Sequence, residues 1–367
     1  MKGQWIGRTT GDIEGLIIIN IDDYGKHYIG EVYVFPDNHE EPSSAGFFKT
    51  KDKSARMDFK AVITSIDPRT GTPGMWEVIK KYYPSITNYS KEADVIVHFN
   101  KNKLHLGAKT DIGIKIESEI IRKQFTTDSD VEGDTKSWEE YKSFVSTLLG
   151  QKNLFRGQRA RWKLRTAFHR RRRYCLTRFR TEDIHQLRRQ LSARTPHLFN
   201  LNDPDEFGAF LNLAQNHGYP TPLLDWTRSP YVAAFFAFKE VPKNVKENDF
   251  VRIYFFNEKK WRTDWQQVYR IDATALHLSV LETLAIGNER LIPQQSVTTV
   301  TNIDDIESYI KSKEIESGSN YLTAINLPVS ERNIVMQELF FMGITAASMF
   351  PGLDGACEEL REKMFDE

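Results

Sequence analysis

Two stretches of the chain decide the fold of its second half: Asn153-Leu154-Phe155-Arg156-Gly157-Gln158 and Leu223-Leu224-Asp225-Trp226-Thr227-Arg228-Ser229-Pro230. Each contains a short apolar run typical of a β-strand that is followed by polar groups, which a rigid sheet would hold at the rim of a cleft. The first stretch supplies a guanidinium, which pairs with phosphate or carboxylate. The second supplies a carboxylate, an indole and two hydroxyls just before a helix. Together they suit a ligand that carries phosphate and ribose.

The composition of the chain allows two domains with sizeable cores. It has 367 residues, of which 40% are hydrophobic and 12% aromatic. The net charge is zero but unevenly distributed, because residues 156–194 contain thirteen Arg and one Lys against Glu182 and Asp183, a net charge of +12. One strongly basic segment in a neutral chain predicts a local anionic partner.

Several classes of protein are disfavoured by what the sequence lacks. Cys175 and Cys357 are isolated, which argues against a disulfide framework or a cysteine-only zinc site and suits a reducing cytosol. There is no signal-peptide-like segment and no apolar run near the ~20 residues of a membrane span, so we expect a cytoplasmic protein without membrane association. Walker A, GxGxxG, HExxH and GxSxG motifs are missing, and we expect no metal.

Residues 1–125 have the alternating pattern of antiparallel β-structure, with a hairpin signal at Asp23-Tyr24-Gly25 and another at residues 100–103. The pattern predicts a small sheet or an open barrel without catalytic residues, whose role would be to bind a partner or a target. The expected strands are residues 15–22, 26–35, 57–66, 95–99, 104–106 and 113–116, with a short helix at 76–83.

Residues 126–136 are polar and predict a linker, after which Ser137 and Glu140 form a capping-box pattern at the start of the second domain, residues 137–367. Helical segments over residues 160–217 separate the two stretches quoted above, and further strands follow. The fold class predicted is therefore α+β, with an N-terminal antiparallel β domain followed by a mixed α/β domain that has a helical insertion. The later strands and helices expected are 223–224, 231–238, 250–256, 295–301, 321–325 and a last helix from Ser330 to Leu339.

The individual motifs each allow a structural and a functional interpretation. Arg156 precedes a glycine, which would let a ligand approach the backbone, but the arginine could instead pair with Asp225 inside the fold. Thr227 or Ser229 is expected to cap the following helix, whose N-terminus could also hold an anion. His217 could act as an acid, a base or a ribose donor, or be a structural loop residue.

The basic segment could bind the phosphates of a nucleic acid, with interleaved aromatic rings stacking on bases. The alternatives are a solvated helix face and a contact with an acidic protein. The residues proposed for nucleic-acid binding are Arg170, Arg171, Arg172, Arg173, Arg178 and Arg180.

From about Ser137 to the C-terminus the chain resembles the FRG domain family, named for its Phe/Tyr-Arg-Gly motif. Phe155-Arg156-Gly157-Gln158 matches that motif, and residues 215–227 match the family's Gln-His-His-Gly-Leu-Pro-Thr-Arg-Leu-Leu-Asp-Trp-Thr pattern. Phe350-Pro351-Gly352-Leu353-Asp354-Gly355 matches its closing Phe-Pro-Asp-Leu-Asp-Gly. Pro222 replaces the usual arginine of the second pattern, which removes one possible phosphate ligand.

The order of motifs also resembles that of NAD-dependent mono-ADP-ribosyltransferases, and the resemblance implies an ADP-ribosyltransferase-like fold for the second domain. In that layout Arg156 would hold the NAD phosphate, and Asp225 would stabilise the charge that develops at the ribose. Thr227 would line the nicotinamide ribose. The transferases carry a catalytic Glu or Gln on a late strand; this chain lacks the Glu, and Gln294 would take its position. The residues implied in binding NAD are Phe155, Arg156, Gly157, Gln158, His217, Tyr219, Trp226 and Ser229.

The function implied is an NAD-dependent ADP-ribosyltransferase toxin of a bacterial toxin–antitoxin or phage-defence (antiviral) system. Its acceptor would be a nucleic acid, RNA rather than DNA, and an antitoxin protein would neutralise it. The alternatives are a nucleic-acid-binding module without catalysis and an NAD glycohydrolase. A protein acceptor also fits the basic segment.

Overall fold

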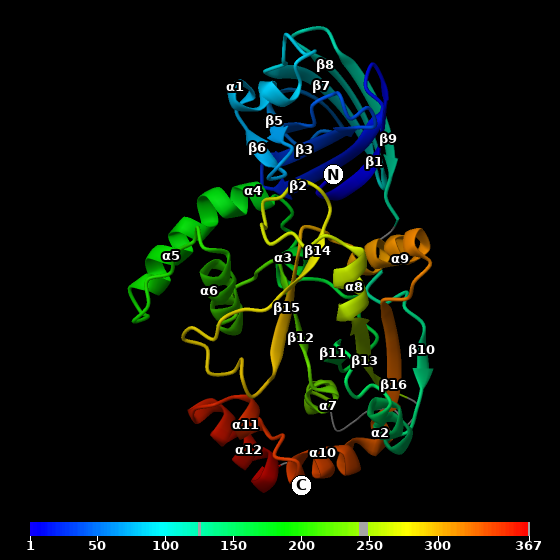
Figure 1. The fold of residues 1–367 in the computed structure, drawn as a ribbon, viewed down its shortest axis with the longest axis vertical. Coiled ribbons are helices and arrows are strands. Elements are labelled where there is room, and N and C mark those ends of the chain that lie inside the picture. Colours follow the sequence, from blue (N-terminus) through cyan, green and yellow to red (C-terminus); the bar gives the residue numbers. More distant parts are fainter. Residues whose placement is uncertain (124–125, 242–248, 366–367) are drawn as a thin grey trace.

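The computed structural model describes residues 1–123, 126–241 and 249–365, so that the last two residues of the expected first domain lie outside the described ranges. Two sheets organise the chain (Figure 1): a β-barrel formed by its N-terminal part, and a mixed sheet with helices on both faces. The chain is therefore of the α+β class, as its sequence predicts. Among the described residues, no helix has both the length and the apolar character that crossing a membrane requires.

The barrel is built from eight antiparallel strands, each paired with the next one along the chain. The ring is closed, because β9 pairs with β1. A short strand, β6 (Thr72–Gly74), extends the end of β5 and leads into α1 (Trp76–Ile79) and the 3₁₀ turn η1 (Lys80–Tyr82). The barrel strands are β1 (Gly3–Gly11), β2 (Gly15–Asp23), β3 (Tyr28–Pro36), β4 (Ser44–Lys49), β5 (Arg56–Asp67), β7 (Glu92–Asn100), β8 (Lys103–Thr110) and β9 (Lys115–Ile121).

The closed ring differs from the small sheet or open barrel that the sequence predicts. The difference comes from β1 and β4, two strands that the sequence patterns did not indicate. β1 contains three glycines in nine residues, and β4 has only six residues with Gly46 among them. Glycine interrupts the apolar–polar alternation by which strands are recognised.

The second sheet has the strand order β10-β16-β13-β11-β12-β15-β14. All neighbours are antiparallel except β10 and β16, which are parallel. β11 and β12 are neighbours near the centre of the sheet, so the two stretches that carry the sequence motifs lie side by side (Figure 1). The strands are β10 (Gly133–Thr135), β11 (Asn153–Gln158), β12 (Leu223–Thr227), β13 (Phe250–Asn257), β14 (Leu278–Leu281), β15 (Ser296–Thr301) and β16 (Leu322–Pro328).

Helices cover both faces of this sheet, since alternate residues of β13 enter different cores: Phe255 packs with α2, α7 and α10, whereas Tyr254 and Phe256 pack with α8 and α9. The capping box of Ser137 and Glu140 is present, and Ser229 caps α7. The helices are α2 (Trp138–Ser146), α3 (Ala167–Arg170), α4 (Leu176–Arg178), η2 (Phe179–Asp183), α5 (Ile184–Ser192), α6 (Pro204–Asn216), α7 (Pro230–Lys239), α8 (Glu258–Asp264), α9 (Ile306–Ser317), η3 (Val329–Glu331), α10 (Arg332–Phe341), α11 (Ala346–Met349) and α12 (Leu353–Phe365).

Residues 126–136, expected to be a linker, instead pack against the second domain. β10 pairs with β16, and the Ser129 hydroxyl and the Asp130 amide both donate to the buried carboxylate of Glu307. The polar composition suits this role, because a short edge strand is largely exposed on one side.

Residues 173–178 form one part of the contact between the second domain and the barrel, and they lie against the outer side of β2 and β3. Asp22 accepts hydrogen bonds from Arg173 Nε at 2.7 Å and from the Tyr174 amide at 2.6 Å. The Arg178 amide donates to Glu31, and burial raises the pKa of this carboxyl to about 7. Cys175 is fully buried in the same contact, so the two domains share a polar, desolvated interface.

Candidate functional site

A pocket of about 350 Å³ opens where β11 and β12 meet α3 and the end of α6. Its volume lies within the range of small-molecule sites. The lining combines Arg156 and Asp225, which the sequence motifs singled out, with two further arginines. The lining residues are Arg156, Ala167, Arg170, Arg171, Gln215, Gly218, Tyr219, Pro220, Leu223, Leu224 and Asp225.

Arg156 has both an internal contact and a place in the pocket wall. Its Nη1 donates to the backbone oxygen of Asp225 at 2.6 Å, whereas its buried Nε has no hydrogen-bond partner among the described residues. Burial lowers the pKa of the guanidinium, and the charge of Asp225 opposes that shift. The arginine is thus held in place by one hydrogen bond and retains donors for a ligand.

The Asp225 carboxylate is oriented by Gln215, a residue of the second sequence motif whose role the motif itself does not indicate. Gln215 Nε2 donates to Asp225 Oδ1 at 2.5 Å, and Gln215 Oε1 accepts from the Thr221 hydroxyl. Burial raises the pKa of Asp225, while the nearby charges of Arg156 and Arg170 and the Gln215 hydrogen bond lower it. The sequence does contain a signal for this role of Gln215, because it is a polar residue in the last turn of a helix that is otherwise largely buried.

Arg170 and Arg171 add positive charge at the outer side of the pocket. Arg170 ends α3, and its Nη1 donates to the Arg165 carbonyl at 2.8 Å. Arg171 is exposed. Three guanidinium groups and one carboxylate therefore line the same pocket, an arrangement that favours an anionic ligand.

Gly157 serves the packing of helix α7 and not the approach of a ligand. A Cβ atom at this position would lie 1.8 Å from the carbonyl oxygen of Ala233 in α7. Phe155 beside it is buried in the core, where it meets Phe255 edge-to-face at a centroid distance of 5.2 Å. The phenylalanine and glycine of the motif thus position β11, and only its arginine lines the pocket. Gln158 is also buried and lies outside the lining.

Thr227 and Ser229 build the turn between β12 and α7. The Thr227 hydroxyl donates to the Gln294 carbonyl at 2.7 Å and accepts from the Ser229 amide, and Ser229 Oγ accepts from the Val232 amide. Trp226 is buried and donates to Thr299. None of these side chains lines the pocket, because each is occupied by the structure of the turn or the core.

Gln294 does not occupy the strand position that the resemblance implies. It lies in a turn, because Gln295 adopts a left-handed φ of 47° and β15 begins only at Ser296. The Gln294 side chain donates to the Met349 carbonyl at 2.8 Å and is absent from the pocket lining. His217, the C-cap of α6, is exposed outside the lining, whereas Tyr219 lines the pocket and stacks on Phe179.

The six arginines proposed for nucleic-acid binding do not form one open face, since three of them are held by internal ion pairs or ring contacts. Arg173 pairs with Asp22 and Asp183. Arg178 pairs with Glu182 and lies over the Tyr24 ring, and Arg180 donates to the Leu201 carbonyl and lies over the Phe207 ring. Of these six, Arg170, Arg171 and Arg172 are exposed.

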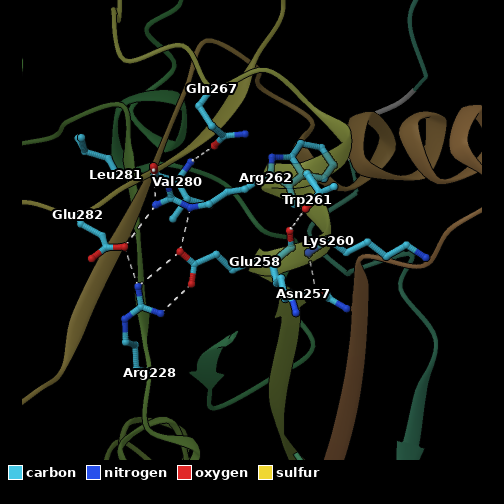
Figure 2. Close-up of polar contacts among 12 residues, drawn as sticks. Arg228, Asn257, Glu258, Lys260, Trp261, Arg262, Gln267, Val280, Leu281 and Glu282 are labelled. Carbon is cyan, nitrogen blue, oxygen red and sulfur yellow. Dashed lines mark hydrogen bonds and ion pairs between the residues drawn. The ribbon is translucent and has the colours of Figure 1, made fainter. Parts of the chain in front are cut away.

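A second cluster of charges follows directly after β12 and is structural (Figure 2). Glu258 is buried and accepts from Arg228 Nη1 at 2.7 Å and from Arg262 Nε at 2.9 Å, so both of its oxygens are used. Glu282 joins the same two arginines. The network links α8 to the residue that follows β12. Both carboxylate oxygens of Glu258 are already paired with arginines, so neither is available to a ligand.

Over the described ranges, no group of three or more His, Cys, Asp or Glu side chains could hold a metal ion.

No curated protein matches the sequence. Among solved structures, a redesigned β-barrel matches with 13% sequence identity and a TM-score of 0.23, and the match covers 34% of this chain and 91% of that barrel. The family model of the FRG domain matches residues 151–246, a shorter stretch than the resemblance suggested. The residues matched by the FRG domain model include β11, the pocket lining and α7.

Proposed function

We propose that the pocket binds NAD and that the protein transfers ADP-ribose from NAD to a nucleic acid, with RNA as the favoured acceptor. The observation that carries the proposal is the composition of the pocket, in which three guanidinium groups accompany one carboxylate of raised pKa. Such a combination suits a ligand that has phosphates at one end and a reacting ribose at the other.

Arg156, Arg170 and Arg171 would hold the two phosphates, because guanidinium groups match phosphate oxygens with paired hydrogen bonds. The buried Nε of Arg156 supports this assignment, since it has no partner among the described residues and a phosphate oxygen would satisfy it. Tyr219, which also lines the pocket, would contact an aromatic ring of the ligand.

In the reaction, the bond between ribose C1′ and the nicotinamide nitrogen breaks, and nicotinamide leaves as a neutral molecule with the bonding electrons. A nucleophilic atom of the acceptor then bonds to C1′ and loses a proton. Positive charge develops on the ribose, and the Asp225 carboxylate would stabilise it. Gln215 would orient that carboxylate, and the charges of Arg156 and Arg170 would favour its ionised form.

The exposed Arg171 and Arg172 support a nucleic acid as acceptor, because Arg171 lines the pocket and both add exposed positive charge next to it. A protein that modifies the RNA of its own cell would be toxic. We therefore place it in a bacterial toxin–antitoxin or phage-defence system of the cytoplasm, with a neutralising antitoxin protein as partner.

The test is to incubate the protein with NAD labelled at the adenylate phosphate, together with total RNA, DNA and cell extract, and to digest the products with RNase, DNase or protease. We expect label that RNase removes, and Arg156→Ala should abolish it. Arg159→Ala is the matched control, because Arg159 is exposed, stacks on Trp162 and lies outside the pocket lining.

The other outcomes separate the alternatives. Release of nicotinamide without label on any acceptor would mean that the protein only hydrolyses NAD. Label that protease removes would identify a protein acceptor. Intact NAD with every acceptor would contradict the proposal and favour a nucleic-acid-binding module, for which Arg171→Ala and Arg172→Ala should each weaken binding to RNA.

A further inference from the structure

The lumen of the N-terminal barrel contains a cavity of about 310 Å³, separate from the pocket of the FRG domain. We propose that this cavity is a second ligand site, which takes a small apolar molecule with one neutral or cationic hydrogen-bonding group. The proposal does not depend on the function proposed for the FRG domain. A closed barrel of eight strands has an interior that side chains can either fill or leave open for one small ligand.

Small side chains keep the lumen open. Gly46, Ala61, Ala93 and Ala108 line the cavity on four different strands. The backbone does not require glycine at position 46, since an added Cβ would meet no atom closer than 3.8 Å. Larger residues would therefore fit, and an unfilled apolar space of this size costs stability because its lining loses contacts. A ligand would restore those contacts.

The polar residues of the lining gather at one end of the barrel. Asp12 follows β1, Glu41 and Ser44 lie at the β3–β4 connection, and Ser90 precedes β7. In an up-and-down barrel these connections all lie at the same end. Ser90 is 6% exposed, and its hydroxyl is buried without a hydrogen-bond partner among the described residues. A ligand with its polar group at this end would satisfy the Ser90 hydroxyl.

The size and charge of the cavity limit the ligand. An apolar protein cavity of ~150 Å³ holds benzene, so the lumen has room for a molecule about twice that size, such as a two-ring aromatic or a medium-length alkyl chain. The carboxylates of Asp12 and Glu41 at the polar end disfavour an anionic head group. We therefore expect alcohols and amines to bind and carboxylates of the same length to be excluded.

The experiment uses the full chain and the fluorescent two-ring amine 1-naphthylamine as the probe, which is displaced with 1-decanol, decylamine or decanoate. We expect the probe to bind with a dissociation constant on the order of 10 µM. Decanol and decylamine should displace it at concentrations at least tenfold lower than decanoate at pH 7.5.

Two neighbouring positions of β5 provide a matched pair of variants. Ala61→Phe fills the lumen and should weaken probe binding at least tenfold. Val62→Phe adds the same ring on the outer side, where Val62 is 61% exposed, and should bind like the wild type. Melting curves show whether each variant is folded; if Ala61→Phe is not, Gly46→Val fills the lumen from β4 instead.

The proposal is overturned if the wild type gives no saturable fluorescence change. It is also overturned if a folded, lumen-filled variant binds the probe as tightly as Val62→Phe. Displacement by decanoate as effective as that by decanol would contradict the assignment of the polar end.

Discussion

Gly157→Ala is expected to lower the free energy of unfolding by about 3 kcal/mol or more, or to prevent folding of the second domain. The new methyl group would lie 1.8 Å from the Ala233 carbonyl oxygen and 2.8 Å from the Ala237 amide nitrogen. Both are backbone atoms of α7, so the clash is relieved only if the whole helix moves away from β11. Urea unfolding followed by circular dichroism measures the effect.

Gly107→Ala is the control for this experiment, because a Cβ at Gly107 would meet nothing within 4 Å and the residue also lies in a strand. Its free energy of unfolding should change by less than about 1 kcal/mol. The double variant Gly157→Ala with Ala233→Gly should remain destabilised, since the obstruction is a carbonyl group. Wild-type stability of Gly157→Ala would show that α7 does not approach β11 so closely.

Asp225→Asn is expected to lower the turnover of NAD by about 10²- to 10³-fold while the protein stays folded. Asparagine keeps an oxygen that can accept the hydrogen bond of Gln215, but it lacks the negative charge that would stabilise the ribose. Asp354→Asn, which changes an exposed aspartate of α12, should leave turnover unchanged. Nicotinamide release by each variant is measured, with melting curves as the check of folding.

The pH dependence distinguishes a catalytic Asp225 from a structural one. Burial raises the pKa of its carboxyl, and only the ionised form can stabilise positive charge. Wild-type turnover should therefore fall on acidification at a higher pH than that at which an ordinary aspartate is protonated, and Asp225→Asn should lack this step. Equal turnover in both proteins across the pH range would exclude the proposed role.

The features that could be predicted from the sequence are those set by local chemistry. Ser137 and Ser229 cap helices because their hydroxyls reach amides three residues away. The apolar runs around Arg156 and Asp225 form neighbouring strands, and their two side chains line one pocket.

The remaining features depend on partners far away in the chain. Arg173 was assigned to a basic face, but its partner Asp22 lies 151 residues earlier, on the barrel. The role of Gly157 is set by the path of α7, and Gln294 is held in its turn by Met349. No periodicity or motif encodes such pairings, because they arise only when distant segments pack together.

The contact between the barrel and residues 173–178 gives the chain a built-in chemical reporter. Cys175 is fully buried there, its thiol faces the carbonyls of Asn20 and Ile29, and burial raises its pKa well above the ordinary value. An alkylating reagent can reach this thiol only while the contact around residues 173–178 is open. Cys357 is exposed and reacts freely, so the ratio of the two alkylation rates measures how often that contact opens.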